Sequence, residues 1–343
     1  MDQNWVLQQI RKASLHRLIW WGGLLACALL FVVAQHRYAI NFFQGPFTLT
    51  KAELDAIGDA STAPRYFARV TASKVIDTGI RQITIRKRRG VESSRSESGQ
   101  FHVLVLEDRL LVVRNSGGAQ ATAEGQLVPL QGELEARLFG TPDMQSIKQR
   151  FYPFYVDDDS FRLPGYIAIG VILALAFLAF RFGAAPLQHY LKPSTHPVAA
   201  RVASWGDTAR IAAQAAEESR APLAKSRGWL VTPTYLVRMA HFTFDLHRLA
   251  DLQWAYKRVT TSNMVKMHSA VLMLNGAPRG IEIQGPEKIT DGVLNSAATR
   301  VPWAVFGYSP EIEQHFNQNR QGFAATIVQR RADWAQRQTG AAA

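Results

Sequence analysis

Two aromatic and two cationic side chains fall within the nine residues DLQWAYKRV at positions 251–259: Trp254, Tyr256, Lys257 and Arg258. Cations near a bilayer attract anionic lipid headgroups, and aromatic rings beside cations can stack on nucleic-acid bases. Lys266 lies close by in the sequence. Lys257, Arg258 and Lys266 are therefore candidate contacts to lipid headgroups.

The same stretch has the alternation of a half-buried β-strand. With a period of two, Leu252, Trp254 and Tyr256 face one side of the strand, whereas Gln253 and Lys257 face the other. This pattern favours a core strand whose cations face water, with lipid contact as the alternative. Nucleic-acid binding is not expected, because aromatics and cations on opposite faces form no stacking platform.

The sequence contains no recognisable catalytic motif. His241 and His247 flank Asp245, but a metal site needs a third ligand placed by the fold, so ordinary structural histidines are expected. None of the nine histidines belongs to an HExxH motif, and nucleophile-elbow, phosphate-loop and dinucleotide motifs are absent. We therefore expect no enzymatic activity, no cofactor, no metal and no small-molecule substrate.

The elements that must position these side chains begin with two apolar runs. Residues 18–34 (LIWWGGLLACALLFVVA) and 166–180 (YIAIGVILALAFLAF) carry no charge. A bilayer core needs about 20 residues of helix, and we predict transmembrane helices at residues 18–35 and 164–185. The alternative, a buried helix of a globular domain, would require protein on every face of each run.

The first run also fits a cleaved secretory signal. It has a basic start, an apolar stretch and the small-residue ending Val32-Val33-Ala34. Trp20 and Trp21 favour a retained helix, because indole side chains prefer the headgroup boundary of a membrane. We expect a retained anchor, with cleavage as the alternative.

Cations beside the two runs predict their orientation. They are Arg11, Lys12 and Arg17 before the first run and Arg181, Lys192 and Arg201 after the second. Lys and Arg close to helix ends stay in the cytosol. Both termini are therefore predicted to be cytosolic, and residues 36–163 extracytoplasmic.

Small residues suggest how these helices could pack. Gly22 with Ala26, and Gly170 with Ala174, each place two small side chains four positions apart on one helix face. This spacing lets helices approach closely, although it also arises by chance in Ala-rich helices. No ionisable residue lies inside either run, so a transporter or channel is not expected.

Period-two patterns predict β-rich domains on both sides of the membrane. In residues 36–163, short runs that include a hairpin at residues 101–106 and 110–114 predict a small β-barrel or sandwich. The basic, serine-rich stretch at residues 86–99 is predicted to be a loop. The single cysteine, Cys27, excludes an intrachain disulfide.

The C-terminal half continues with a proline-rich linker and one amphipathic helix, several strands and a helix that begins at Ser309-Pro310. Strands capped by one C-terminal helix are the layout of a pleckstrin-homology-like β-barrel. The class is thus an α+β membrane protein. The predicted boundaries are 1–17 (cytosolic segment), 18–35 (first span), 36–163 (exported domain), 164–185 (second span), 186–227 (linker and helix) and 228–338 (pleckstrin-homology-like domain).

A family resemblance supports this architecture. The runs HPVAARVASWGDTARIAAQAAEE, GWLVTPTYLVR, LADLQWAYKRVTT and VPWAVFGYSPEIEQHFNQNRQGFAATIVQRR resemble a family of uncharacterised bacterial membrane proteins. The likeness covers about the last 190 residues, and FYPFYVDDDSFRLPGYI extends it. It implies two transmembrane helices, an exported β domain, a cytosolic pleckstrin-homology-like domain and the bacterial cytoplasmic membrane as location, and it implies no activity.

Two functions follow as hypotheses. The first is a non-enzymatic, membrane-anchored adaptor or scaffold that binds an unidentified protein partner or a second copy of itself. The second is a cytosolic domain that binds anionic lipid headgroups, because residues 165–343 hold 19 Lys or Arg against 11 Asp or Glu. An enzyme with an unrecognised site is a minor alternative.

Overall fold

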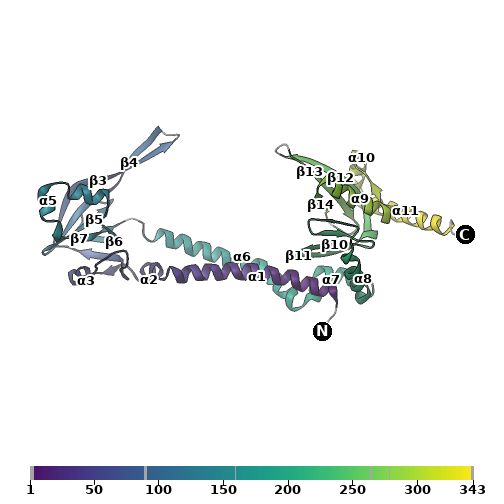
Figure 1. Ribbon diagram of the computed structural model, residues 1–343, viewed down its shortest axis with the longest axis horizontal. Helices are drawn as coiled ribbons and strands as arrows, with labels where there is room; N and C mark the ends of the chain where they lie inside the picture. Colours follow the sequence, from purple (N-terminus) through teal and green to yellow (C-terminus); the bar gives the residue numbers. More distant parts are fainter. Residues whose placement is uncertain (1–3, 89–90, 159, 263–264, 278, 341–343) are drawn as a thin grey trace. The chain divides into compact units, whose positions relative to one another are not determined.

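The computed structural model of the chain describes residues 4–88, 91–158, 160–262, 265–277 and 279–340. The chain divides into two compact units, whose elements are labelled in Figure 1. Unit 1 comprises Met1–Gly23 and Leu178–Ala343, and unit 2 comprises Leu24–Phe177. Both units combine helices with sheets, so the predicted α+β class is confirmed.

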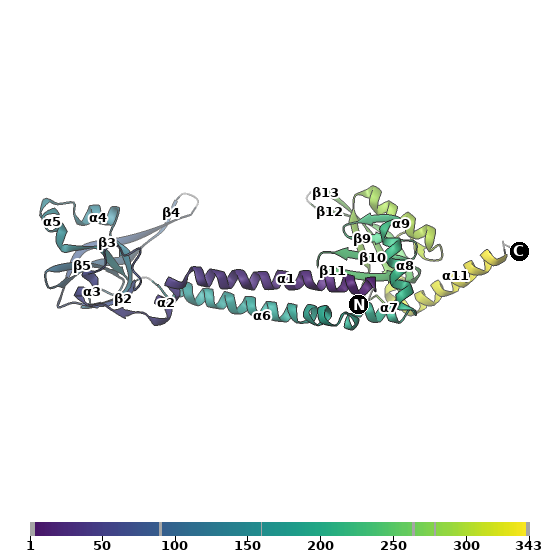
Figure 2. The ribbon, with the colours of Figure 1, turned by 60° about the horizontal axis from the view of Figure 1, so that its bottom comes forward.

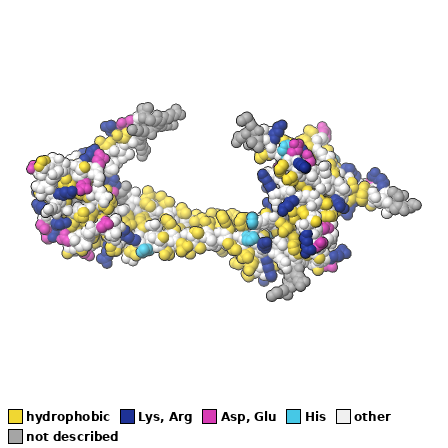
Figure 3. Space-filling model, viewed as in Figure 1, with side chains coloured by type: hydrophobic (Ala, Val, Ile, Leu, Met, Phe, Trp, Pro, Cys, Tyr) yellow, Lys and Arg dark blue, Asp and Glu magenta, His cyan; other side chains and the backbone are white. Residues whose placement is uncertain are grey.

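Two helices are long and apolar enough to cross a membrane: α1 (Trp5–Ala34) and α6 (Leu163–Leu191). The most apolar window of α1 is 0% buried, and that of α6 is 11% buried. Figure 3 shows hydrophobic side chains along the visible surface of the long helices. This exposure removes the alternative of a buried globular helix, which would have protein on every face.

Both helices exceed the predicted spans. α1 begins at Trp5 instead of residue 18, and α6 continues through Pro186 to Leu191. A proline inside a helix removes a backbone hydrogen bond without always ending the helix. The linker predicted from residue 186 therefore shrinks to a short 3₁₀ turn, η2 (Pro193–Thr195).

Unit 2 is built on one seven-stranded sheet with the order β1-β2-β6-β7-β5-β4-β3. Its strands are β1 (Phe47–Thr48), β2 (Phe67–Thr71), β3 (Lys74–Arg88), β4 (Val91–Leu106), β5 (Arg109–Asn115), β6 (Thr122–Pro129) and β7 (Phe151–Asp157). The ladders are antiparallel except for β1–β2 and β5–β7. The described strands form an open sheet, not the barrel predicted for this segment.

Alternating side chains of this sheet build two hydrophobic layers. Leu104, Leu111 and Phe154 belong to one layer, whereas Phe101 and Val112 belong to the other. Figure 2 shows α4 (Glu133–Leu138) and α5 (Pro142–Ser146) on one side of this sheet. The remaining helical elements of unit 2 are α2 (His36–Gln44), α3 (Lys51–Asp55) and the 3₁₀ turn η1 (Lys148–Arg150).

Two hairpins of unit 2 give opposite outcomes for the sequence predictions. The hairpin predicted at residues 101–106 and 110–114 is confirmed as β4–β5. The stretch at residues 86–99, predicted as a loop, instead belongs to the β3–β4 hairpin, where Arg81 and Glu97 pair across the strands at 2.8 Å. Polar side chains do not prevent strand pairing where both faces meet water. Arg89 and Gly90 of this stretch lie outside the described residues.

Unit 1 contains two four-stranded sheets, ordered β11-β10-β9-β8 and β14-β13-β12-β15. Their strands are β8 (Ala224–Ser226), β9 (Trp229–Val231), β10 (Tyr235–Ala240), β11 (Thr243–Arg248), β12 (Leu252–Ser262), β13 (Val265–Leu274), β14 (Ile281–Gly285) and β15 (Val305–Phe306). Neither sheet closes into a barrel among the described residues. The helix α9 (Glu287–Arg300), which the sequence patterns did not reveal, packs against β8 and β13.

The other helices of unit 1 differ from the predictions at their ends. α7 (Pro197–Ala203) and α8 (Thr208–Arg220) replace one amphipathic helix, because Gly206 adopts φ 118° and Asp207 caps α8. Ser309 caps α10 (Pro310–Gln318), as predicted. α11 (Arg320–Gly340) follows after a break at Asn319, so Gly322 lies inside a helix.

The first turns of α1 form part of the core of unit 1. Val6 and Ile10 are each 1% exposed, and they pack in one cluster with side chains of α7, α8 and the sheet β8–β11. Trp5 meets Phe244 edge to face at a ring separation of 5.6 Å. The segment predicted as a cytosolic N-terminal extension, residues 1–17, therefore contributes its described part to the C-terminal domain.

Replacing Ile10 with Ala should lower the free energy of unfolding of unit 1 by about 2–4 kcal/mol, because the change removes buried methyl groups and leaves a cavity. Leu15→Ala is the matched control, since Leu15 on the same helix is 38% exposed, and it should cost less than about 1 kcal/mol. Denaturant unfolding of the full chain in detergent measures both variants. Equal losses would contradict the packing of α1.

Candidate functional site

A cleft of about 460 Å³ opens in unit 1 beside α1. Its walls come from α1, the turn between β8 and β9, and the β10–β11 hairpin. Lys12, His16, Arg227 and His241 line it, and no Asp or Glu occurs among its described lining residues. We call it the basic cleft after those four side chains.

The helix α1 supplies two of the four side chains. Lys12 and His16 are four residues apart, so they lie on one face of the helix. His16 Nδ1 lies 2.9 Å from the carbonyl oxygen of His241. Because a carbonyl oxygen can only accept a hydrogen bond, His16 donates from Nδ1, and its Nε2 does not take part in this bond. Arg17 Nε donates to the carbonyl of Phe242 at 2.6 Å. These bonds hold α1 against the β10–β11 hairpin.

Arg227 reaches the cleft from a strained turn. Ser226 pairs with Trp229, so Arg227 and Gly228 alone connect β8 to β9. Both have positive φ values, 42° and 80°, as a type I′ turn requires. A side chain other than Gly or Asn at such a φ costs about 1–3 kcal/mol. Strain of this kind is typical of positions whose side chain has a function.

Exposed apolar side chains flank the basic cleft. Trp20 is 62% exposed, Phe242 is 44% exposed and Met239 is 38% exposed. Trp20 and Phe242 meet edge to face with their ring centres 6.1 Å apart. Cations beside exposed aromatic rings are typical of a surface that rests at the headgroup level of a membrane.

The predicted headgroup contacts lie outside this cleft. Lys257 contacts Glu287 at 2.7 Å and Asp291 at 2.9 Å, and hydrogen bonds to these carboxylates raise its pKa above the usual value. Arg258 donates to the Tyr256 hydroxyl at 3.1 Å and lies 3.6 Å from Glu282. Lys266 is exposed on β13. The first two cations thus have acidic partners within the domain, and their contact with lipid stays a prediction.

The aromatic residues of the same strand are buried, as predicted. Trp254 is 1% exposed and Tyr256 is 4% exposed, and they pack in one cluster with Phe316 and Phe323. Leu252 belongs instead to the cluster that contains Ala255. The ladder β12–β13 shifts register between residues 252 and 254, and such a bulge moves Leu252 to the opposite face.

The histidines singled out in the sequence are not brought together. His241 lines the basic cleft, whereas His247 Nε2 lies 3.2 Å from Asp245, which also binds Arg201 at 2.8 Å. No group of three or more potential ligands that could hold a metal occurs among the described residues.

The small residues predicted for helix packing face outward. Ala26 and Ala174 are exposed, and a Cβ built on Gly22 or Gly170 meets no atom within 4 Å. Close packing occurs instead at Gly165, where a Cβ would lie 2.4 Å from the Phe42 ring. The four predicted residues are thus free for contacts with other molecules, and their role in self-association stays a prediction.

No protein-family model matches the chain, and neither does any curated protein or solved structure in the comparisons.

The sequence held partial signals for the cleft. In the sequence, Lys12 is one of the cations that predict the orientation of the first helix. The pair Arg227-Gly228, between two short strands, has the spacing of a tight turn. Nothing in the sequence places residues 12 and 227 in one cleft, because their shared position depends on the docking of α1.

Arg227→Asn should raise the free energy of unfolding by about 1 kcal/mol, because Asn adopts a positive φ more easily than Arg. Lys225→Asn is the control, since residue 225 lies in β8, where Asn has no such advantage. Thermal unfolding of the full chain in detergent measures both. A loss of stability in Arg227→Asn would show that the Arg227 contacts outweigh the strain.

Proposed function

We propose that the chain is an integral membrane protein whose C-terminal unit binds anionic lipid headgroups through the basic cleft. The observation that carries the proposal is a cleft lined by Lys12, His16, Arg227 and His241, without an acid among its described lining residues. The proposal includes no enzymatic activity and no cofactor.

Membrane insertion is supported by the exposed apolar surfaces of α1 and α6. Water penalises such surfaces, whereas hydrocarbon accommodates a helix whose backbone bonds are internal. The orientation proposed from the flanking cations places both termini in the cytosol of a bacterium and residues 36–163 outside its cytoplasmic membrane.

The core of unit 1 supports the same topology. Val6 and Ile10 pack with residues of α7 and α8, which supports a topology with both ends of the chain on one side of the membrane. Two spans give this topology and one span does not. Cleavage after Ala34 would also remove Val6 and Ile10 from the core, which favours a retained anchor over a secretory signal.

Single cysteines in a Cys27→Ser background should report this topology. Gln8→Cys and Thr339→Cys should react with a membrane-impermeant maleimide only in inside-out vesicles, and Ser98→Cys only in right-side-out vesicles. All three positions are exposed, so access depends on the membrane alone. Labelling of positions 8 and 339 from different sides would contradict the two-span arrangement.

The helix places the cleft near the lipid headgroups. Lys12 precedes the apolar run by six residues, or roughly 9 Å of helix. Trp20 and Trp21 begin the part that enters the bilayer, and Trp21 stacks on Phe182 of α6 at 5.8 Å. A lipid phosphate at the membrane surface would thus lie within reach of Lys12 and Arg227.

The order of elements supports a pleckstrin-homology-like arrangement in the C-terminal unit. Four consecutive strands, β8 to β11, form one sheet, and three more, β12 to β14, form the main part of the other. The helix that follows is α9, which packs on both sheets. We propose α9 as the capping helix, in place of the predicted helix at Ser309.

A protein adaptor is the second proposed function. It is favoured by the β3–β4 hairpin of unit 2, where Ile83 and Ile85 are 52% and 44% exposed. Exposed apolar side chains on a narrow hairpin are typical of a binding surface for another protein.

Anionic lipid should stabilise unit 1 through the cleft. We expect the full chain in nanodiscs of phosphatidylcholine to gain thermal stability when phosphatidylglycerol is included. The gain should fall by about 1 kcal/mol for each cation removed in Lys12→Gln and Arg227→Asn. Lys288→Gln is the control, since Lys288 is exposed on α9, outside the cleft.

The same measurement separates the cleft from the contacts predicted from sequence. Lys257→Gln, Arg258→Gln and Lys266→Gln should leave the lipid effect unchanged. A lipid effect that survives in the cleft variants and is lost in these three would contradict the proposal.

A further inference from the structure

The hairpin of β3 and β4 extends the seven-stranded sheet as a narrow arm (Figure 1). The two strands contain 15 and 16 residues, and β3 is the last strand of the described sheet. All side chains from residue 81 to residue 85 are exposed. A two-stranded ribbon is marginally stable in water, and a third strand stabilises it.

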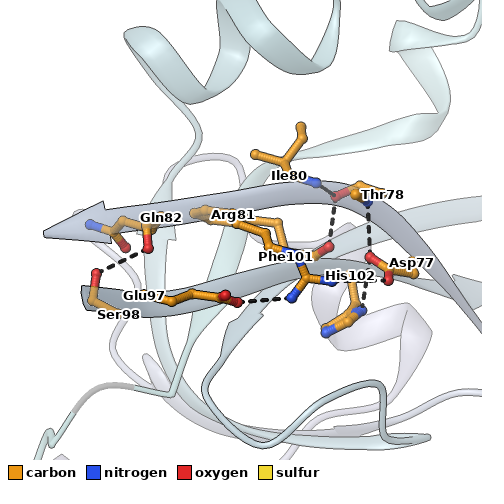
Figure 4. A network of polar contacts seen from close by, with 10 residues as sticks. Asp77, Thr78, Ile80, Arg81, Gln82, Glu97, Ser98, Phe101 and His102 are labelled. Atoms are coloured by element: carbon orange, nitrogen blue, oxygen red, sulfur yellow. Dashed lines mark hydrogen bonds and ion pairs between the residues drawn. The ribbon is translucent and has the colours of Figure 1, made fainter. Parts of the chain in front are cut away.

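A bulge marks the base of this arm. The β3–β4 register shifts between Asp77 and Arg81. Figure 4 shows how side chains hold the bulge: Thr78 Oγ1 donates to the Phe101 carbonyl at 2.6 Å, and Asp77 Oδ1 accepts from the Gly79 amide at 2.9 Å. Bulges redirect the strand that follows, so the edge beyond Arg81 is oriented separately from the main sheet.

A groove of about 480 Å³ accompanies the redirected edge. Its apolar part includes Ile80, Ile83 and Ile85 of β3 with Leu134 of α4. Three arginines add cations: Arg81 pairs with Glu97 and Asp77, Arg95 with Glu92, and Arg137 with Glu133. These pairs are exposed to water and therefore weak, so another carboxylate can share the guanidinium donors.

We infer that β3 accepts an extended, acidic segment of another protein as an added strand. The outer edge of β3, which pairs with no other strand that the structure describes, would supply backbone hydrogen bonds. The groove would bind apolar side chains at alternate positions of the segment. The inference rests on the proposed adaptor role and not on the basic cleft, which lies in the other unit.

Charge decides what kind of segment fits. An added strand would neighbour β3 directly, whereas the acids of β4 lie one strand further away. Among the β3 side chains that the structure describes, Lys74 and Arg81 are cationic and Asp77 is acidic, and Arg95 and Arg137 add cations to the groove. Like charges directly opposite each other destabilise a strand pair, so β3 of a second copy is a poor partner and an acidic strand is a good one.

The test uses an eight-residue peptide of alternating Glu and Val as the probe, with the full chain in detergent. Two control peptides carry Lys in place of Glu, or N-methyl groups on alternate amides. We expect the acidic peptide to slow hydrogen exchange of the β3 amides at residues 81–85, and both controls to bind at least about tenfold more weakly.

Two matched variants locate the site. Ile83→Thr should weaken binding about fivefold by removing one apolar contact. Ile76→Thr should not, because Ile76 is an exposed β3 residue (45%) outside the groove. Thr favours strands, so neither change should unfold the hairpin.

Four results would overturn the inference: no protection of the β3 amides, equal binding of the Lys peptide, equal losses in the two variants, or β3 protection that grows with protein concentration alone and so indicates a second copy. A stoichiometric protein partner that co-purifies equally with Ile83→Thr would keep the adaptor role and remove β3 as its site.

Discussion

The packing of α1 into unit 1 is the interaction on which the other features depend. Val6 and Ile10 are almost fully buried among side chains of α7, α8 and the sheet β8–β11. The helix then continues without a break into its apolar part. The C-terminal part of unit 1 is thus held to α1 by core packing in addition to the covalent connection through the chain. This attachment places the described start of α1 and the C-terminal half of the chain in one folded unit.

The basic cleft is a consequence of that packing. Once the first turns of α1 are buried, the helical period places Lys12 and His16 beside the β10–β11 hairpin. Arg227 joins them through a turn whose backbone favours Asn or Gly. Basic side chains from separate parts of the chain thus line one cleft that has no Asp or Glu among its described lining residues.

Unit 2 follows a different principle. Its sheet buries apolar side chains on both faces near the centre, whereas the β3–β4 hairpin beyond the bulge exposes both of its faces. The first part of β3 therefore belongs to the core sheet, whereas the part beyond the bulge is exposed to solvent. The bulge at residues 77–81 separates these roles, because a register shift changes the direction of the strand.

The sequence by itself determined the features that depend on local composition and period. The two apolar runs, the β4–β5 hairpin, the capped start of α10 and the burial of Trp254 and Tyr256 all follow from neighbouring residues, and each is present in the structure. The predicted helix boundaries were wrong where a proline or glycine changed a regular pattern. The predicted strand face of Leu252 was wrong because of a bulge.

Only the tertiary structure decided the features that join distant residues. The open sheets, the position of α9 and the partners of Lys257 depend on packing between elements, which a periodic pattern does not encode. The cleft is the clearest case. Lys12 and Arg227 are 215 positions apart in the sequence, and they line one cleft because burying the apolar face of α1 brings its polar face to the β8–β9 turn.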